Sequence, residues 1–362
     1  MKICVYAICK NEEKHVKKWY NSMKEADEIY VLDTGSTDKS KEKLEKLGVF
    51  VTRKIIKPWR FDVARNESLK LVPNDADICV CTDFDEVFEK GWRKQLEKLW
   101  VNNVNHVRYN YNWNFDKNNK PLINFYIEKI HSRNDYKWVN PVHEVLKFIN
   151  NNSKEICVTT DKITLNHHQN FKKSRSNYLP LLELSVKENP LNDRNMHYLG
   201  REYMYYNRYN EAIDVLIKHL SLKSATWKDE RCASMRFISR CYFNLKRYNE
   251  ALMWINLAIK EASYLRDGYM QKALMLFELK QYKNCIDTID KALLIKKHPK
   301  TYINEYFSFN ETPYDLLSIC YYNLGNYDKS YKNVKIAYKM NPKDKRIKNN
   351  KKLIRKKRNS LL

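Results

Sequence analysis

Three carboxylates crowd the end of an apolar segment early in the chain. Residues 78–82 read Ile-Cys-Val-Cys-Thr, and Asp83, Asp85 and Glu86 follow at once. Like charges this close repel one another unless a cation lies among them. Oxygen ligands favour Mg²⁺ or Mn²⁺, ions that commonly bridge proteins to phosphates. The cluster therefore predicts a divalent-metal site, with a solvated acidic turn as the alternative.

A second acidic position follows another apolar segment. Residues 29–32 read Ile-Tyr-Val-Leu, and Asp33 opens the string Asp-Thr-Gly-Ser-Thr-Asp over residues 33–38. Ligands of parallel α/β sheets bind at the carboxyl ends of strands, where an aspartate can accept hydrogen bonds from a base or a ribose. Thr37 and Asp38 are suited to begin the next helix. The string indicates either a nucleotide site or ordinary turn chemistry.

Two arginines lie between these acidic positions. Arg60 and Arg65 fall at the start of a segment with helical character, residues 61–71. Guanidinium groups bind phosphates through paired hydrogen bonds, and helix starts favour anions. Either arginine is therefore a candidate for contact with a uracil or a diphosphate. For Arg60, an ion pair with Asp62 at the helix start is the alternative.

The elements that must position these residues alternate along the first hundred residues. Strands are predicted at 3–8, 28–32, 49–56 and 78–82, with helices at about 12–23, 38–47 and 61–71. This rhythm is typical of a mostly parallel sheet covered by helices. The later segments that alternate in the manner of antiparallel strands are 104–113, 122–131 and 156–165.

From about residue 171 the chain is expected to be helical, and it contains an internal repeat. The string Arg-Tyr-Asn-Glu-Ala at 208–212 recurs at 247–251, with weaker copies at 281–285 and 326–330. The tyrosines at 209, 248, 282 and 327 are 39, 34 and 45 residues apart, which predicts longer loops after the first and third units. Small residues recur where paired helices must touch, namely Gly200, Ser239, Ala273 and Ser318 on the first helices and Ala258, Ala292 and Ala337 on the second. Such units stack into a curved array.

Composition limits the class of protein. The chain has 362 residues, an apolar share of 43% and a formal net charge of +24. It is long enough for two compact domains with ordinary cores. The charge indicates either a surface that attracts anions or the bias of an AT-rich genome. Its densest part, residues 343–358, is expected to be a solvated tail or helix end, and contact with nucleic acid or a membrane is the less favoured reading.

Cysteine usage and hydropathy bear on the compartment. Nine cysteines cannot all pair within one chain, and several, such as Cys4 and Cys79, fall inside apolar strands. Reduced, buried thiols are expected, which fits a cytoplasmic protein. The apolar run 3–9 is too short for a signal segment, and no segment is long enough to span a bilayer. No nucleic-acid motif is present, so specific nucleic-acid binding is not expected.

The order and spacing of the motifs resemble a known family. The matching pieces are Lys10-Asn11-Glu12, the string at 33–38, Ala64-Arg65-Asn66 and Asp83-Phe84-Asp85. Together they resemble family 2 glycosyltransferases of the GT-A fold. Residues 138–144, which end in Val-His-Glu, and residues 165–168 are similar to a subgroup related to lipopolysaccharide-core glucosyltransferases. The helical part resembles tetratricopeptide repeats, and the whole is similar to the peptide S-glycosyltransferases that modify bacteriocin cysteines.

The resemblance implies a two-part architecture. An α/β GT-A domain with a Rossmann-like, nucleotide-sugar-binding sheet is expected over residues 1–170. A linker helix at 171–189, an all-α tetratricopeptide-like repeat domain at 190–345 and a basic C-terminal tail at 346–362 follow. The implied activity is metal-dependent transfer of a sugar with inversion, and UDP-glucose is the first donor to consider.

The resemblance also assigns roles to individual residues. The positions that match the nucleotide-sugar site are Ala7, Asp33, Thr34, Arg65 and Asp83. Those that match a site for Mn²⁺ or Mg²⁺ are Asp83 and Asp85, with a further ligand from His167 or His168. The metal is expected to hold the diphosphate and to neutralise charge on the leaving group.

Inverting transfer needs a general base beside the acceptor. Glu144 is the candidate for that base, and His143 is either its orienting partner or a competing base. The alternative for both residues is a structural pair at a strand edge. Trp113 and Trp138 either stack on a sugar or acceptor ring or belong to the core, and the core is slightly favoured.

The acceptor and the use of the repeats are left open. The resemblance favours a peptide or protein side chain as acceptor, and the alternative is a saccharide or lipopolysaccharide core. Tetratricopeptide grooves commonly hold peptides, and such repeats also form homodimers. A non-catalytic adaptor with a vestigial enzyme half is a different alternative, against which the intact acidic motifs at 33–38 and 83–85 count.

Overall fold

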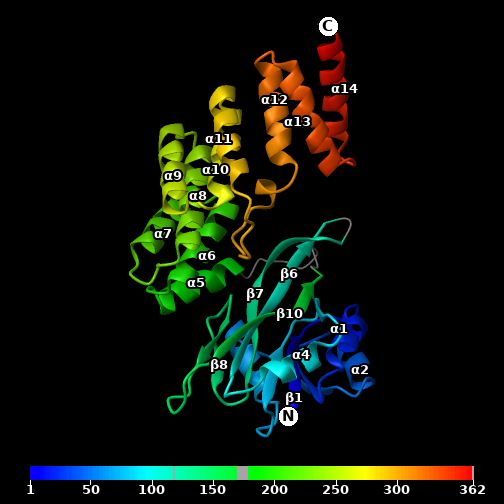
Figure 1. Cartoon of the computed structure of the whole chain (residues 1–362). Helices are drawn as coiled ribbons and strands as arrows, with labels where there is room; N and C mark the ends of the chain where they lie inside the picture. The colour runs from blue at the N-terminus through cyan, green and yellow to red at the C-terminus, as the bar shows by residue number, and fades with distance from the viewer. Residues whose placement is uncertain (117–118, 169–177, 361–362) are drawn as a thin grey trace. The chain divides into compact units, whose positions relative to one another are not determined.

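The computed structural model describes residues 1–116, 119–168 and 178–360. It divides into two compact units, which are coloured along the chain in Figure 1. Unit 1 comprises Met1–Glu188 together with Lys300–Tyr302, and unit 2 comprises Asn189–Pro299 and Ile303–Leu362. The division between the two units falls between Glu188 and Asn189.

A mixed sheet of eight strands forms the centre of unit 1. Its strands, in spatial order, are β3 (Phe50–Arg53), β2 (Glu28–Asp33), β1 (Ile3–Cys9), β4 (Ile78–Cys81), β7 (Pro121–Ser132), β6 (His106–Phe115), β10 (Cys157–His167) and β5 (Glu86–Phe88). A separate hairpin pairs β8 (Tyr136–Val139) with β9 (Val145–Phe148). The GT-A-like α/β architecture expected from the sequence is confirmed.

The first four strands form the parallel half of the sheet. Strand β1 lies between β2 and β4 and runs parallel to both, and β2 also runs parallel to β3. Because these four strands run parallel, their carboxyl ends lie at one edge of the sheet, and helices in the connections return the chain to the other edge. The intervening helices are α1 (Val16–Met23), α2 (Ser40–Glu45) and α3 (Phe61–Leu69).

The second half of the sheet differs in one respect from the sequence prediction. Strand β7 is antiparallel to both β4 and β6, as the alternating pattern indicated. Strand β10 was grouped with them, yet it runs parallel to β6 and antiparallel only to the short β5. The prediction that residues 156–165 behave like the other two was therefore wrong for this pairing. Side-chain alternation has the same period in both kinds of strand, so it does not report direction.

Both faces of the parallel half are buried. On one face, Val5 and Val80 pack with Trp19 and Met23 of α1 and with Trp92 of α4 (Trp92–Leu99). On the other, Tyr6 and Cys79 pack with Leu69, at the end of α3, and with Trp138. Continuous apolar strands such as Ile3–Cys9 are the expected consequence of burial on two sides.

Unit 2 is a series of antiparallel helix pairs (Figure 1). The first helices of the pairs are α6 (Asp193–Tyr205), α8 (Lys228–Asn244), α10 (Arg266–Glu278) and α12 (Thr312–Asn323). The second helices are α7 (Tyr209–Ser221), α9 (Tyr248–Glu261), α11 (Tyr282–Leu294) and α13 (Tyr327–Met340). Each repeated tyrosine is therefore the first residue of a second helix. A further helix, α5 (Tyr178–Glu188), belongs to unit 1, and a short 3₁₀ helix spans Tyr306–Ser308.

The recurring small residues lie at the contacts inside each pair. The Ser239 hydroxyl donates to the carbonyl of Ala251 at 2.7 Å, and Ser330 donates to the carbonyl of Ser318 at the same distance. A Cβ on Gly200 would lie 2.4 Å from Cγ of Leu216, so only glycine fits there. The longest connection, 17 residues between α11 and α12, follows the third unit as the tyrosine spacing predicts.

The last described helix is α14 (Lys345–Asn359), over residues that were expected to form a basic tail. Asp344 begins it by accepting hydrogen bonds from the backbone N–H groups of Arg346 and Ile347. Ile347 and Ile354 are buried against α13. Of the two readings of this basic run, a solvated tail or a helix end, the segment is a packed helix, because two apolar residues seven positions apart share one helical face.

No helix in the described ranges is both long and apolar enough to cross a bilayer. All nine cysteines are free thiols, and only Cys157 is exposed.

Candidate active site

The acidic positions meet at the carboxyl edge of the parallel strands. Asp33 ends β2 directly beside Cys9 at the end of β1. Cys81 ends β4 and pairs with Tyr6 of β1, so Asp83 leaves the sheet at the same edge. Strand β1 lies between β2 and β4, and all three are parallel, so Asp33 and Asp83, fifty positions apart in sequence, follow strands that end at the same edge.

Asp33 is buried and only partly satisfied. Its Oδ1 accepts hydrogen bonds from the backbone N–H of Ser36 at 2.8 Å and of Gly35 at 3.2 Å. Its Oδ2 has no hydrogen-bond partner within the described residues, and the nearest cation is Nε of Arg53 at 3.9 Å. A buried carboxylate oxygen left without a donor is costly, which is typical of a ligand site.

The two neighbouring nucleotide-site candidates are differently placed. The Thr34 hydroxyl donates to the carbonyl of Cys9 at 3.0 Å, so it is already engaged as a donor. The side chain of Ala7 is fully buried in the core of the sheet. Of this group, Asp33 alone presents an unsatisfied side-chain oxygen within the described part of the chain.

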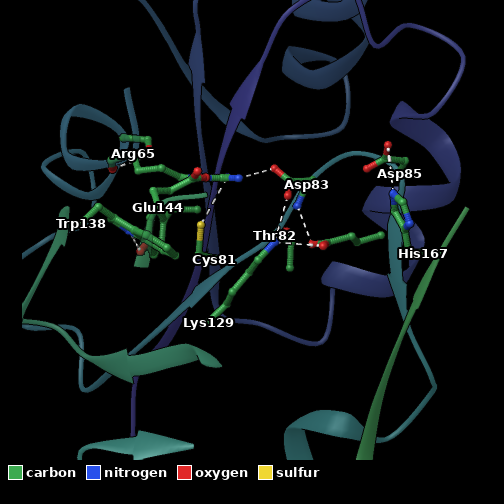
Figure 2. A network of polar contacts seen from close by, with 12 residues as sticks. Arg65, Cys81, Thr82, Asp83, Asp85, Lys129, Trp138, Glu144 and His167 are labelled. Atoms are coloured by element: carbon green, nitrogen blue, oxygen red, sulfur yellow. Dashed lines mark hydrogen bonds and ion pairs between the residues drawn. The ribbon is translucent and has the colours of Figure 1, made fainter. Parts of the chain in front are cut away.

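Arg65 of α3 joins two of the predicted site residues (Figure 2). Its Nη2 donates to Oδ1 of Asp83 at 2.5 Å, and its Nε donates to Oε1 of Glu144 at 3.1 Å. The guanidinium is almost fully buried and lies over the Trp138 ring, 5.6 Å from its centroid. The structure therefore brings Arg65, Asp83 and Glu144 together.

Lys129 of β7 is a functional-site residue that the sequence reasoning missed. Its Nζ donates to Oδ2 of Asp83 and to Oε1 of Glu86, each at 2.9 Å. Glu86 is buried and also accepts from the Tyr111 hydroxyl at 2.9 Å. The available signal was weak, because the register of β7 shifts between Ile127 and Ile130 and simple alternation does not assign a face to Lys129.

The five side chains form a chain of alternating charge, from Glu144 through Arg65, Asp83 and Lys129 to Glu86. Burial raises the pKa of Asp83, but Arg65 and Lys129 outweigh it and hold that pKa well below its usual value. Burial likewise lowers the pKa of Lys129, and its two carboxylate partners reverse the shift. Asp83 is therefore ionised, with each oxygen bonded to a cation.

Asp85 is placed apart from this chain and next to a histidine. Its Oδ2 lies 3.5 Å from Nε2 of His167, the last residue of β10, as seen at the right of Figure 2. The Nδ1 atom of His167 faces the carbonyl of Trp113 at 2.9 Å, which orients the ring. Burial lowers the pKa of His167, but Asp85 outweighs it and the net shift is upward. His168 meets Asp85 through its backbone N–H at 2.7 Å, while its ring stacks on Phe115.

The segment after β8 positions Glu144. Asn140 and His143 both adopt left-handed backbone conformations, with φ of 80° and 50°, and the carbonyl of Pro141 accepts from the first N–H of α3. The ring of His143 packs edge-on against Tyr178 of α5, with centroids 5.8 Å apart. Glu144 instead bonds Arg65, so the two candidates for the general base, Glu144 and His143, lie in different surroundings.

Burial and contacts distinguish the alternatives that the sequence left open for Trp138, Trp113 and Arg60. Trp138 is core: it is 3% exposed, and its indole N–H donates to the Tyr6 hydroxyl at 2.7 Å. Trp113 is 38% exposed and stacks on His167, with centroids 4.5 Å apart. Arg60 pairs with Asp62 at 2.9 Å and also with Glu188, as its helix-start alternative predicted.

The donor set around Asp85 suits a divalent ion only in part. No group of three or more His, Cys, Asp or Glu side chains is arranged to hold a metal among the residues that the structure describes. Asp83 is bonded to two cations, which leaves Asp85 and His167 as the adjoining oxygen and nitrogen donors. Such a pair fits Mn²⁺ or Mg²⁺ when phosphate oxygens and water complete the shell.

Comparison with known proteins identifies the class to which these features belong. Residues 4–153 match the family described as "Glycosyl transferase family 2", and residues 267–299, which contain α10 and α11, match "Tetratricopeptide repeat". The N-terminal domain is therefore a family 2 glycosyltransferase domain of the GT-A fold, and the C-terminal domain consists of tetratricopeptide repeats. The protein is a glycosyltransferase.

Individual relatives agree with this assignment. The chain is 24% identical over 310 residues to the SPbeta prophage-derived glycosyltransferase SunS of Bacillus subtilis, which covers 80% of this chain and 71% of that protein. An uncharacterized glycosyltransferase of Rickettsia bellii is 32% identical over 109 residues, covering 30% of this chain and 35% of that protein.

Solved structures are also similar to part of this chain. A thermophilic tetratricopeptide protein of Thermus thermophilus is 16% identical with a TM-score of 0.36, covering 49% of this chain and 88% of that chain. MamA from Desulfovibrio magneticus is 12% identical with a TM-score of 0.38, covering 47% and 87%.

The alternating charge chain predicts a large stability effect at Lys129. Lys129→Met leaves the buried Glu86 without its counter-ion, so we expect a loss of about 3–5 kcal/mol in the free energy of unfolding, measured in urea. The matched control is Lys54→Met, which removes the same cation from an exposed pair with Glu67 and should cost less than about 1 kcal/mol. The double variant Lys129→Met/Glu86→Gln should recover part of the loss. Equal effects of the two single variants would contradict this account.

Proposed function

We propose that this protein is a metal-dependent hexosyltransferase that moves a sugar from a uridine diphosphate donor to a peptide side chain, with inversion. The alignment of Asp33, Asp83 and Asp85 at one edge of the sheet, beside Arg65 and Glu144, carries this proposal. UDP-glucose is the first donor to test. The nine free cysteines, eight of them buried, support a reducing, cytoplasmic location.

Asp33 is the proposed contact to the base. Its buried Oδ2 needs a donor, and a uracil ring offers an N–H of the right kind. The Arg53 guanidinium lies 3.9 Å away on a side chain that is 53% exposed. Asp83, about one third exposed at the same edge, is the proposed acceptor for a ribose hydroxyl.

Charge balance supports the need for a divalent ion. The alternating chain contains three carboxylates and two cations, and Asp85 adds a further carboxylate beside it. An anionic diphosphate cannot bind favourably beside these carboxylates without a further cation. A bound Mn²⁺ or Mg²⁺ would supply that charge and stabilise the leaving diphosphate. Asp85 and His167 are the residues proposed to hold it.

Glu144 is the proposed general base. It is 13% exposed and is held by Arg65, which also contacts Asp83, so the base and the donor side of the site are joined through one guanidinium. The base would take the proton from the acceptor as it attacks the sugar carbon from the face opposite UDP. The attack on that opposite face gives inversion.

The proposed metal site is tested at Asp85. Asp85→Asn should weaken Mn²⁺-dependent binding of UDP at least tenfold, measured by calorimetry, and should abolish turnover in a screen of nucleotide sugars. The matched control is Asp75→Asn, which removes an exposed carboxylate paired with Lys2. Unchanged binding in Asp85→Asn, with the fold intact by circular dichroism, would refute the metal assignment.

The acceptor class is tested by offering the enzyme either a peptide or oligosaccharides. With UDP-glucose and Mn²⁺, a cysteine-containing peptide should gain one hexose by mass spectrometry, and its Cys→Ser version should show whether sulfur is the linkage atom. The peptide class is favoured by the resemblance to peptide S-glycosyltransferases and by the repeat domain, since paired helices commonly hold peptides or a second copy of the chain. Transfer to oligosaccharides alone would establish the alternative, a saccharide or lipopolysaccharide-core transferase.

The base assignment predicts a separation of binding from turnover. Glu144→Gln should lower the rate of transfer by roughly 10²–10⁴-fold, the usual contribution of a positioned base. Its binding of UDP with Mn²⁺ should stay within about twofold, because Arg65 keeps its bond to Asp83. Glu188→Gln is the control, since Glu188 also pairs with an arginine beside α3. Transfer above half the wild-type rate in Glu144→Gln would exclude this residue as the base.

A further inference from the structure

The positive charge of the chain is concentrated in its last two described helices. Residues 327–359, which span α13 and α14, contain fourteen Lys or Arg and two Asp, a net charge of +12 out of +24 for all 362 residues. Less than a tenth of the residues therefore carry half of the net positive charge. A bias in base composition would spread the charge evenly, so this concentration calls for a local physical reason.

Helix α14 separates its apolar and cationic residues onto opposite faces. At 100° per residue, Ile347 and Ile354 fall on one side, and both are buried against α13. The opposite side is an exposed stripe of five cations within an arc of about 100°, about 17 Å long. The residues of this cationic stripe are Lys345, Lys348, Lys352, Arg355 and Lys356.

The other cations of α14 are already used within the domain. Arg346 pairs with Asp315 at 2.7 Å, and Arg358 pairs with Asp328 at 2.6 Å. Lys351 lies over the Tyr338 ring at 4.1 Å. Within the described residues, no side chain makes an ion pair or ring contact with any member of the cationic stripe. Five like charges held together on one rigid face repel one another unless an anionic partner relieves them.

We propose that the cationic stripe of α14 binds the surface of a membrane that contains anionic lipids. Lysine clusters on amphipathic helices attract anionic headgroups by electrostatics alone. The apolar face of α14 is taken up by α13, so binding does not require insertion of that face. Leu353, 63% exposed beside the stripe, and Met340, 47% exposed at the end of α13, add shallow apolar contacts.

The composition of the stripe favours lipid over nucleic acid. Four of its five cations are lysines, which act as point charges, whereas recognition of bases and phosphates favours the paired hydrogen bonds of arginine. The stripe contains no aromatic side chain on which a base could stack. This surface would hold the glycosyltransferase at the cytoplasmic face of a membrane, and the inference does not depend on which donor or acceptor the enzyme uses.

The test uses the full-length protein and vesicles of phosphatidylcholine with or without phosphatidylglycerol. We expect co-sedimentation with the anionic vesicles at about 0.15 M salt, and loss of binding as added salt screens the stripe. In the stripe variant, Lys345, Lys348, Lys352 and Lys356 are all changed to Gln. Each lysine near an anionic surface contributes about fivefold in affinity, so this variant should bind at least tenfold more weakly.

A matched control separates the stripe from net charge. Changing Lys218, Lys223, Lys260 and Lys283, all exposed elsewhere in unit 2, to Gln removes the same four charges and should alter binding less than twofold. Circular dichroism should show unchanged helicity in both variants, since Ile347 and Ile354 are untouched. Equal weakening in both variants, no binding by the wild type, or tighter binding to generic duplex DNA than to the vesicles would each overturn the proposal.

Discussion

A buried chain of alternating charge is the interaction on which the catalytic domain depends. Glu144, Arg65, Asp83, Lys129 and Glu86 come from five different segments of the chain. Charges removed from water are tolerated only when they are paired, so each member fixes the position of the next. These ion pairs fix five segments relative to one another, namely the segment after β8, helix α3, the loop after β4, strand β7 and strand β5.

The same chain sets the chemistry available at the edge of the sheet. Because Arg65 and Lys129 already neutralise Asp83, that carboxylate is held as an ionised hydrogen-bond acceptor. Asp85 lies next to His167, and these two residues are the ones proposed to hold a divalent ion that a diphosphate would share. The acidic triplet is divided by strand β7, whose Lys129 bonds both Asp83 and Glu86, while Asp85 lies beside His167.

The repeat domain obeys a simpler constraint. Each helix pair closes where a small residue on one helix meets the backbone of the other, as at Ser239 with Ala251. Local spacing alone determines such contacts, so the sequence predicted the four repeat units and the small residues at which paired helices touch. In α14 only Ile347 and Ile354 pack against the neighbouring helix. The opposite face of α14 is therefore exposed, and it carries the cationic stripe.

The sequence by itself determined the strand and helix rhythm, the acidic residues at strand ends and the repeat units, because each depends on periodicity or spacing within one segment. Only the tertiary structure decided that β10 runs parallel to β6, that Trp138 is core, and that Lys129 reaches Asp83. These features depend on which strands are neighbours in space. Side-chain alternation is the same for either strand direction, and a lysine in an alternating strand carries no mark of the carboxylate it will meet.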